Sequence, residues 1–254
     1  MKPLLVCSNS TKNLLTDFER VRVVSSAPDV SILDEVGTEE SVTAIGGGAV
    51  IDTAKILSKN PIHCYPTTAA GSSATSWSVY WDGTKKCSLK RMKPNVITMH
   101  LEFTESLPYD MVVETTYDVV SHCLDSVHSK KKVIESLEYC YYALELLRNK
   151  KRNYDLIRAG HIAGKAIEIT GTNLLHSLSY PLTGHYGISH GMALGYFLPK
   201  VSKFMDYDVS DIIDEFPFDL EVDIDFVIDE ALKYDKINEF SIFINKEILQ
   251  EVLK

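Results

Sequence analysis

Short β-branched runs alternate with turns and short helix-like segments over the first hundred residues of the chain. Each run ends at Gly, Pro or Ser, which is typical of strands bounded by turns. The strand-like runs are 3–7, 20–26, 41–48, 62–66 and 93–100. Helical candidates lie between them at 10–18 and 50–58. This rhythm predicts βαβ units and a mostly parallel sheet.

The pattern changes near Leu107, where glycines and β-branched runs become scarce and apolar positions recur at helical spacing. The predicted helices cover 110–128, 131–149, 154–169, 171–180, 188–207, 223–234 and 246–253. We therefore expect an α/β domain over 1–107, followed by an all-helical domain over 108–254. The acidic segment 206–230 is interpreted as a solvated surface.

Composition narrows the functional classes. The formal net charge is −9 and there is no basic run, so nucleic-acid binding is not expected. No stretch approaches the roughly 18 consecutive apolar residues of a membrane span, and the start turns polar after Cys7, too early for a signal peptide. The five cysteines are scattered without a CxxC pair, which indicates reduced thiols in a cytoplasmic protein.

Two loops could hold phosphate groups. In SVTAIGGGAVIDTAK (41–55), a strand enters three glycines and a helix begins at once, so backbone N–H groups could approach a pyrophosphate. The sequence is not GxGxxG, and a tight turn without a ligand explains it equally well. In YPTTAAGSSATSW (65–77), hydroxyls follow a strand and could contact phosphate or ribose, although a simple loop of small residues is the alternative.

Histidines gather in two places that could form one metal site. Asp118 and His122 are four residues apart on a predicted helix and share one face, either as metal ligands or as an ordinary surface pair. His176 and His190 lie in HSLSYPLTGHYGISHG, where each could instead be a packed core residue. Together the four would give one oxygen and three nitrogens, a set that suits Zn²⁺ or Fe²⁺.

Five segments, in this order, resemble the iron-containing alcohol dehydrogenase family of the dehydroquinate-synthase-like fold: GGGAVIDTAK, PTTAAGSS, DVVSH, LLHSLSYPL and GISHGMALGYFLP. The resemblance implies an NAD(P)H-linked reductase of small aldehydes, with the cofactor in a cleft between an α/β nucleotide-binding domain and an all-helical metal-binding domain. The residues it implies at the cofactor are Gly46, Gly47, Gly48, Asp52, Thr67, Thr68 and Ser72. Those it implies at the metal, Fe²⁺ or Zn²⁺, are Asp118, His122, His176 and His190.

The chain departs from the family pattern in three ways. It is shorter than usual members, its second loop reads AAGSSA, and Tyr180 stands where many members carry a second histidine. The resemblance implies that the residue at this position aids proton transfer, so we expect Tyr180 or His185 to be catalytic. A tyrosine with an ordinary pKa near 10 is a weak acid at neutral pH.

The combination of AGKAIEIT and HSLSYPLTGHYGISHG also resembles a subgroup of phosphonoacetaldehyde reductases, which have a tyrosine after the ligand histidine and form 2-hydroxyethylphosphonate. This resemblance would place the protein in phosphonate metabolism. A phosphonate requires cations near the cleft. The candidates are Lys90, Arg91, Lys93, Arg158 and Lys165. The segment CSNSTK after the first strand has no acidic residue, which favours NADPH over NADH.

Two alternatives to a reductase remain at this stage. One is a lyase of the dehydroquinate-synthase type, which usually has glutamate at the position of Asp118. The other is a shortened family member without catalysis that binds a partner. The family resemblance further implies a homo-oligomer.

Overall fold

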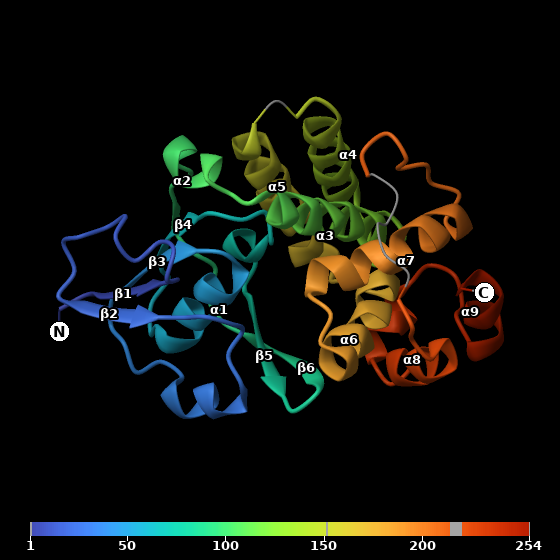
Figure 1. Ribbon diagram of the computed structural model, residues 1–254, viewed down its shortest axis with the longest axis horizontal. Helices are drawn as coiled ribbons and strands as arrows, with labels where there is room; N and C mark the ends of the chain where they lie inside the picture. Colours follow the sequence, from blue (N-terminus) through green and yellow to red (C-terminus); the bar gives the residue numbers. More distant parts are fainter. Residues whose placement is uncertain (1, 151, 214–219, 254) are drawn as a thin grey trace.

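The computed structural model describes residues 2–150, 152–213 and 220–253. A parallel sheet occupies the N-terminal side of the molecule and a group of helices the other, as Figure 1 shows. This is the α/β-then-helical arrangement that the hydrophobic pattern predicts. The position of the domain boundary, at 107 and 108, stays a prediction, although helix α3 begins close to it at Tyr109.

Five parallel strands form the sheet in the order β2-β1-β3-β4-β7. They are β1 (Leu4–Cys7), β2 (Arg20–Val23), β3 (Val42–Gly46), β4 (His63–Pro66) and β7 (Val96–Ile97). Strand β1 is buried along its whole length, as its apolar sequence LLVC requires. Strand β2 is at the edge and alternates between half-buried and exposed residues. Strand β3 leads directly into helix α1 (Gly48–Leu57), which packs on the sheet.

A β-hairpin that the sequence interpretation missed extends from the sheet toward the helices (Figure 1). Its strands are β5 (Trp77–Asp82) and β6 (Lys85–Lys90), joined across Gly83 and Thr84. Gly83 has a positive φ of 58°, which the tight turn requires. The signal was present, because Asp-Gly between two runs of strand-forming residues is a strong hairpin pattern.

The prediction of a helix at 10–18 was wrong. Residues 9–13 form turns instead, held by hydroxyl groups. The hydroxyl of Thr11 donates to the carbonyl of Ile45, and the amide of Ser8 donates to Thr11 Oγ1 at 3.0 Å. Such local bonds compete with a helix. The strand predicted at 93–100 is also much shorter, since only Val96 and Ile97 pair with β4.

The helical part follows the predicted periodicity closely. Its main helices are α3 (Tyr109–Val127), α4 (Ile134–Arg148), α5 (Asn153–Thr170), α6 (Leu174–Tyr186), α7 (His190–Phe204), α8 (Ile224–Ala231) and α9 (Lys246–Leu253). Shorter elements are η1 (Val30–Glu35), η2 (Ser72–Ala74), α2 (Leu101–Glu105) and η3 (Asp235–Glu239). One large apolar core joins the helices α3 to α9.

Part of the acidic segment 206–230 forms α8, and residues 214–219 lie outside the described part. Within the described ranges, every helix falls short of the length or the apolar character that a membrane span needs. All five cysteines are free thiols, and Cys87 of the hairpin is the one that is not buried.

Candidate metal and substrate site

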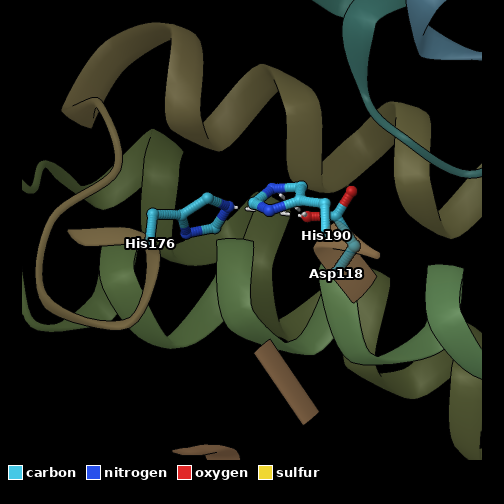
Figure 2. Close-up of side chains that lie close together, drawn as sticks. All are labelled: Asp118, His176 and His190. Carbon is cyan, nitrogen blue, oxygen red and sulfur yellow. Dashed lines mark ion pairs between the residues drawn. The ribbon is translucent and has the colours of Figure 1, made fainter. Parts of the chain in front are cut away.

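Three helices bring four side chains together in the interior. Helix α3 carries Asp118 and His122 one turn apart, α6 carries His176 in its first turn, and α7 begins at His190. The carboxylate oxygen Oδ1 of Asp118 lies 3.3 Å from His122 Nε2, 3.5 Å from His176 Nε2 and 3.9 Å from His190 Nε2. Figure 2 shows Asp118 facing His176 and His190.

These distances fit a metal site. Nitrogen and oxygen ligands held about 2.1 Å from a tetrahedral ion lie about 3.4 Å from one another. Ligand atoms of Asp118, His176 and His190 all lie within 4.8 Å of one another. Asp118 Oδ1 and His176 Nε2 are buried without a hydrogen bond, which a bound ion would remedy. His122 is nearby as well, because its ring stacks on that of His176 with centroids 4.8 Å apart.

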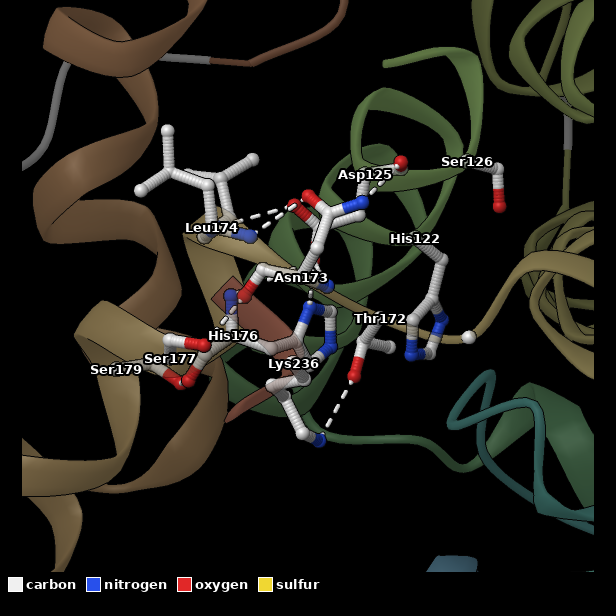
Figure 3. Close-up of polar contacts among 12 residues, drawn as sticks. His122, Asp125, Ser126, Thr172, Asn173, Leu174, His176, Ser177, Ser179 and Lys236 are labelled. Atoms are coloured by element: carbon white, nitrogen blue, oxygen red, sulfur yellow. Dashed lines mark hydrogen bonds and ion pairs between the residues drawn. The ribbon is translucent and has the colours of Figure 1, made fainter. Parts of the chain in front are cut away.

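Asp125 holds His176 in the orientation that this site needs. Its carboxylate oxygen Oδ2 accepts from His176 Nδ1 at 2.8 Å, which leaves Nε2 directed at Asp118. The same carboxylate accepts the backbone amides of Asn173 at 2.8 Å and Leu175 at 3.0 Å. Figure 3 shows this group at the N-terminus of α6. A carboxylate behind a ligating histidine fixes its tautomer and raises its basicity.

Mutual charge sets the pKa values of the cluster. Burial alone would raise the pKa of Asp118, but the charges of His122, His190 and His176 outweigh it and hold that pKa well below its usual range. Burial lowers the pKa of His122 to about 4. For His176, burial is opposed by the nearby carboxylates of Asp118 and Asp125, and the pKa rises to about 9. At neutral pH the cluster therefore combines an ionised Asp118 carboxylate, a neutral His122 and a protonated His176.

His190 has a competing partner. Its Nε2 lies 3.2 Å from Lys86 Nζ, from the hairpin strand β6, and its Nδ1 lies 3.4 Å from Ser179 Oγ. Nε2 has one lone pair, which can accept a hydrogen bond from Lys86 or bind a metal, but not both. A metal bound to His190 Nε2 would therefore free the ammonium group of Lys86 from this contact.

Tyr180 lies beside the histidines and is surrounded by lysines. Its ring stacks on His190 with centroids 6.0 Å apart, and its hydroxyl accepts from Lys236 Nζ at 2.8 Å. Burial would raise the pKa of Tyr180, but the charges of Lys236, Lys86 and His176 outweigh it and lower the pKa to about 7. The hydroxyl is therefore a much stronger acid than an ordinary tyrosine.

A cavity of about 240 Å³ opens at this tyrosine. Its lining combines hairpin residues with residues of α6 and the η3 region. The residues are Val79, Lys86, Cys87, Ser88, Tyr180, Tyr234, Asp235 and Lys236. The hairpin thus forms one wall of the space next to the candidate metal ligands.

The two predicted phosphate loops lie against each other. A β-carbon on Gly47 would lie 2.9 Å from Thr68 Oγ1, and one on Gly48 would lie 3.0 Å from the β-carbon of Ala70 and 3.3 Å from Ser72 Oγ. Glycine is thus needed here for loop-to-loop packing whether or not a ligand approaches. The geometry accommodates both interpretations of the glycine loop.

Two of the remaining predicted cofactor residues have structural partners. The amide of Thr67 donates to the carbonyl of Gly46 at 3.1 Å, which joins the two loops. Asp52 is buried in an ion pair with Lys55 at 2.9 Å, and its other oxygen accepts the amide of Val79 at 3.1 Å. Asp52 therefore anchors the hairpin to helix α1.

The second loop also reaches the histidine cluster. A β-carbon on Gly71, which has a φ of 73°, would lie 3.4 Å from His122 Cε1. The loop can approach helix α5 closely because this helix has a glycine, without a side chain, in each of two successive turns. A β-carbon on Gly160 would lie 2.1 Å from the carbonyl oxygen of Ala69, and one on Gly164 would lie 2.6 Å from that of Gly71. The candidate cofactor loop and the candidate metal site are therefore adjacent.

His185 is placed differently from Tyr180. It is exposed on α6, with Nε2 4.0 Å from Glu230 Oε2, and its ring packs edge-on against Phe226 of α8. Of the two proton donors that the sequence suggested, Tyr180 is the one beside the cluster.

The five predicted phosphonate cations do not line the cavity at Tyr180. Arg91 donates to the carbonyl of Ser58, and Lys165 lies over the ring of Tyr139. The cations at the cavity are Lys86 and Lys236, which sequence reasoning missed. Nothing local distinguishes them, because it is the hairpin and the η3 segment that bring them to α6. Asp125 lies on the same helix as Asp118 and His122, but its complete burial behind His176 could not be read from the sequence.

Known proteins resemble this chain over much of its length. It is 28% identical to 4-hydroxybutyrate dehydrogenase of Clostridium kluyveri over 219 residues, which are 68% of this chain and 57% of that protein. It is 26% identical to maleylacetate reductase of Sphingobium indicum over 191 residues, 66% of this chain and 54% of that protein. Phosphonoacetaldehyde reductase of Streptomyces viridochromogenes is 27% identical over 155 residues, 55% of this chain and 39% of that protein. The chain thus spans about half the length of the curated relatives it matches.

Solved structures share the fold. An iron-containing alcohol dehydrogenase from Thermotoga maritima aligns with a TM-score of 0.81 at 21% identity, over 99% of this chain and 90% of the other. Sulfoacetaldehyde reductase from Bifidobacterium kashiwanohense, in complex with NAD⁺, aligns with a TM-score of 0.83 at 21% identity, over 99% and 90%. A sequence model of the C-terminal part of one family matches residues 113–240, which hold all four candidate metal ligands. Since that match spans half of the residues, the chain belongs to the Fe-containing alcohol dehydrogenase family.

Proposed function

We propose that this protein reduces a small aldehyde to its alcohol with NAD(P)H and a divalent metal. The observation that carries the proposal is the convergence of one carboxylate oxygen and three imidazole nitrogens. Asp118 Oδ1 lies 3.3 to 3.9 Å from the Nε2 atoms of His122, His176 and His190. The ligand set suits Fe²⁺ and Zn²⁺ alike, so either metal supports the proposal.

A bound metal would polarise the substrate carbonyl, and the dihydronicotinamide would supply hydride to its carbon. The protein must then provide a proton for the oxygen. Tyr180 is our candidate donor because its hydroxyl lies in the cavity beside His190, where Lys236 and Lys86 stabilise its deprotonated form. The products are the alcohol, the oxidised cofactor and the Tyr180 phenolate, which regains its proton from solvent, so atoms and charge balance.

For the cofactor, we propose that its phosphates bind at the paired loops. The residues proposed are Gly46, Gly47, Gly48, Asp52, Thr67, Thr68 and Ser72. We favour NADPH, because the segment after β1 carries the hydroxyls of Ser8 and Ser10 and no acidic side chain that would repel a 2′-phosphate. The five free thiols support our placement of the protein in the reducing cytoplasm. We also propose a homo-oligomer.

Phosphonoacetaldehyde is our named candidate substrate. The test is oxidation of NADH and NADPH by the Fe²⁺- or Zn²⁺-loaded protein with phosphonoacetaldehyde, propanal and glycolaldehyde. We expect turnover with at least one aldehyde and its loss in His176→Ala. If metal-loaded protein binds NAD(P)H but oxidises it with none of the aldehydes, the proposal is wrong and a non-catalytic family member is favoured.

A further inference from the structure

Two ammonium groups converge on one aromatic ring in the cavity. Lys86 Nζ lies 4.6 Å from the centroid of the Tyr180 ring and Lys236 Nζ lies 4.8 Å from it. They come from parts of the chain far apart in sequence, the hairpin strand β6 and the η3 segment. Figure 3 shows Lys236 reaching the hydroxyl of Thr172, beside His176.

Neither ammonium group forms an ion pair with a carboxylate within the described ranges 2–150, 152–213 and 220–253. Lys86 Nζ contacts His190 Nε2 at 3.2 Å, and Lys236 Nζ contacts Thr172 Oγ1 at 3.1 Å and the Tyr180 hydroxyl at 2.8 Å. The acidic member of the cavity lining is Asp235, which is exposed. Two half-buried cations without a carboxylate are costly unless an anion arrives to pair with them.

We propose that Lys86 and Lys236 bind the anionic end group of the substrate, so that the enzyme selects short aldehydes bearing a carboxylate, phosphonate or sulfonate. This inference rests on the proposed function and adds the substrate class to it. A metal at His190 would take the lone pair that Lys86 now uses, which frees this ammonium group for the anion.

The geometry also limits substrate length. Lys86 Nζ lies 3.2 Å from Nε2 of the candidate ligand His190, and the ring of Tyr180, which both lysines contact, lies 6.0 Å from the His190 ring between centroids. The two ammonium groups therefore adjoin the metal ligands. A substrate whose aldehyde carbon and anionic group are separated by only one or two carbons suits this short separation.

The test compares acidic aldehydes with neutral ones of similar size. The acidic substrates are 4-oxobutanoate, phosphonoacetaldehyde and sulfoacetaldehyde, and the neutral ones are methyl 4-oxobutanoate and butanal. The quantity measured is the ratio of kcat/KM for acidic over neutral substrate. We expect this ratio to be about 100 for the best acid in the wild-type enzyme, and the order among the three acids identifies the end group.

Lys236→Met and Lys86→Met should each reduce that ratio by about tenfold or more, whereas Lys236→Arg should retain most of it. Loss of Lys236 also removes a partner of Tyr180, but an effect on proton transfer acts on both substrate classes and cancels in the ratio. The matched controls are Lys85→Met and Lys233→Met, which remove exposed lysines on strand β6 and in the turn just before η3 and should leave the ratio unchanged.

Calorimetric titration of the metal-loaded protein with succinate, an unreactive dianion, gives a readout independent of turnover. We expect succinate to bind the wild-type protein and to bind each Met variant at least tenfold more weakly. Butanol, a neutral molecule, should show no such binding. A wild-type ratio near one, or a ratio and a succinate affinity unchanged in both Met variants, would overturn the inference. If all five aldehydes fail to oxidise NAD(P)H, the proposed function fails, and the succinate titration still decides whether the lysines bind an anion.

Discussion

At the scale of single residues, the site depends on side chains that do not touch the reacting atoms. Asp125 accepts three backbone amides at the start of helix α6 and the Nδ1 proton of His176, so one buried carboxylate both caps the helix and orients the imidazole. Lys236 and Lys86 act in a similar way on Tyr180, by changing the charge around its hydroxyl. Replacing such supporting residues should affect metal binding and proton transfer selectively.

Asp125→Asn should weaken metal binding by about 10- to 100-fold, because the amide is a poorer acceptor for His176 Nδ1. The metal-free protein should lose about 1–3 kcal/mol of unfolding free energy, since backbone amides of α6 lose part of their acceptor. Metal titration against a competing chelator and urea unfolding measure the two effects. Asp229→Asn is the control, because this exposed carboxylate pairs with Lys246. Unaltered metal affinity in Asp125→Asn would contradict the assignment.

Tyr180→Phe should retain the ring contacts with His190 and remove the proton donor. We expect the single-turnover rate of NAD(P)H oxidation to fall at least about 100-fold, with the cofactor dissociation constant unchanged. Tyr234→Phe provides the comparison, because its ring packs against Tyr180 with centroids 5.0 Å apart while its own hydroxyl accepts the amide of Lys86 at 3.4 Å. Similar rates in the two variants would argue that another group supplies the proton.

At the scale of elements, regular periodicity was predictable and the irregular connections were not. The buried strand LLVC and the long helices α3 to α7 follow from apolar spacing alone. The helix expected at 10–18 is replaced by turns because the hydroxyl of Thr11 bonds to Ile45, a residue distant in sequence. Such tertiary contacts override local propensity and cannot be read from a short window.

The candidate site divides in the same way. Its four metal positions could be proposed from the sequence because they lie at regular places on helices and in a recognisable order. The two lysines of the cavity could not, because they reach Tyr180 only after the hairpin and the η3 segment have packed on α6. Asp82 and Gly83 indicated a hairpin turn, but nothing in the sequence indicated that Lys86 of this hairpin would lie beside Tyr180.

Gly160→Ala separates packing from helix propensity on α5. Alanine is favoured over glycine inside a helix by about 1 kcal/mol, so propensity alone predicts a more stable protein. The added β-carbon would lie 2.1 Å from the carbonyl oxygen of Ala69, so packing predicts a loss of about 1–3 kcal/mol. Urea unfolding measures the sign. A stabilised variant would show that the second loop does not pack on α5 as described.

At the scale of the whole molecule, the candidate metal site lies where elements from distant parts of the chain meet. Helices α3, α6 and α7 each contribute ligands, and the loop at Gly71 brings the sheet side of the chain against His122. The hairpin also contacts this region, because Lys86 of β6 lies against His190. The hydrogen bond from the amide of Val79 to Asp52 holds the hairpin to helix α1. An ion bound here would therefore stabilise the arrangement of the whole fold.

Metal binding should accordingly raise the unfolding free energy, because an ion that binds only the folded state shifts the equilibrium by mass action. At a free Zn²⁺ concentration 100 times the dissociation constant, the gain is about 2.7 kcal/mol. Thermal unfolding with and without metal measures it, and a chelator should reverse the shift. His176→Ala should abolish the metal-dependent shift. The control is His161→Ala, which removes from helix α5 an imidazole that bonds to Ser73 of η2. This variant should retain the metal-dependent shift. A metal-induced shift that persists in His176→Ala would mean that the stabilising ion binds elsewhere.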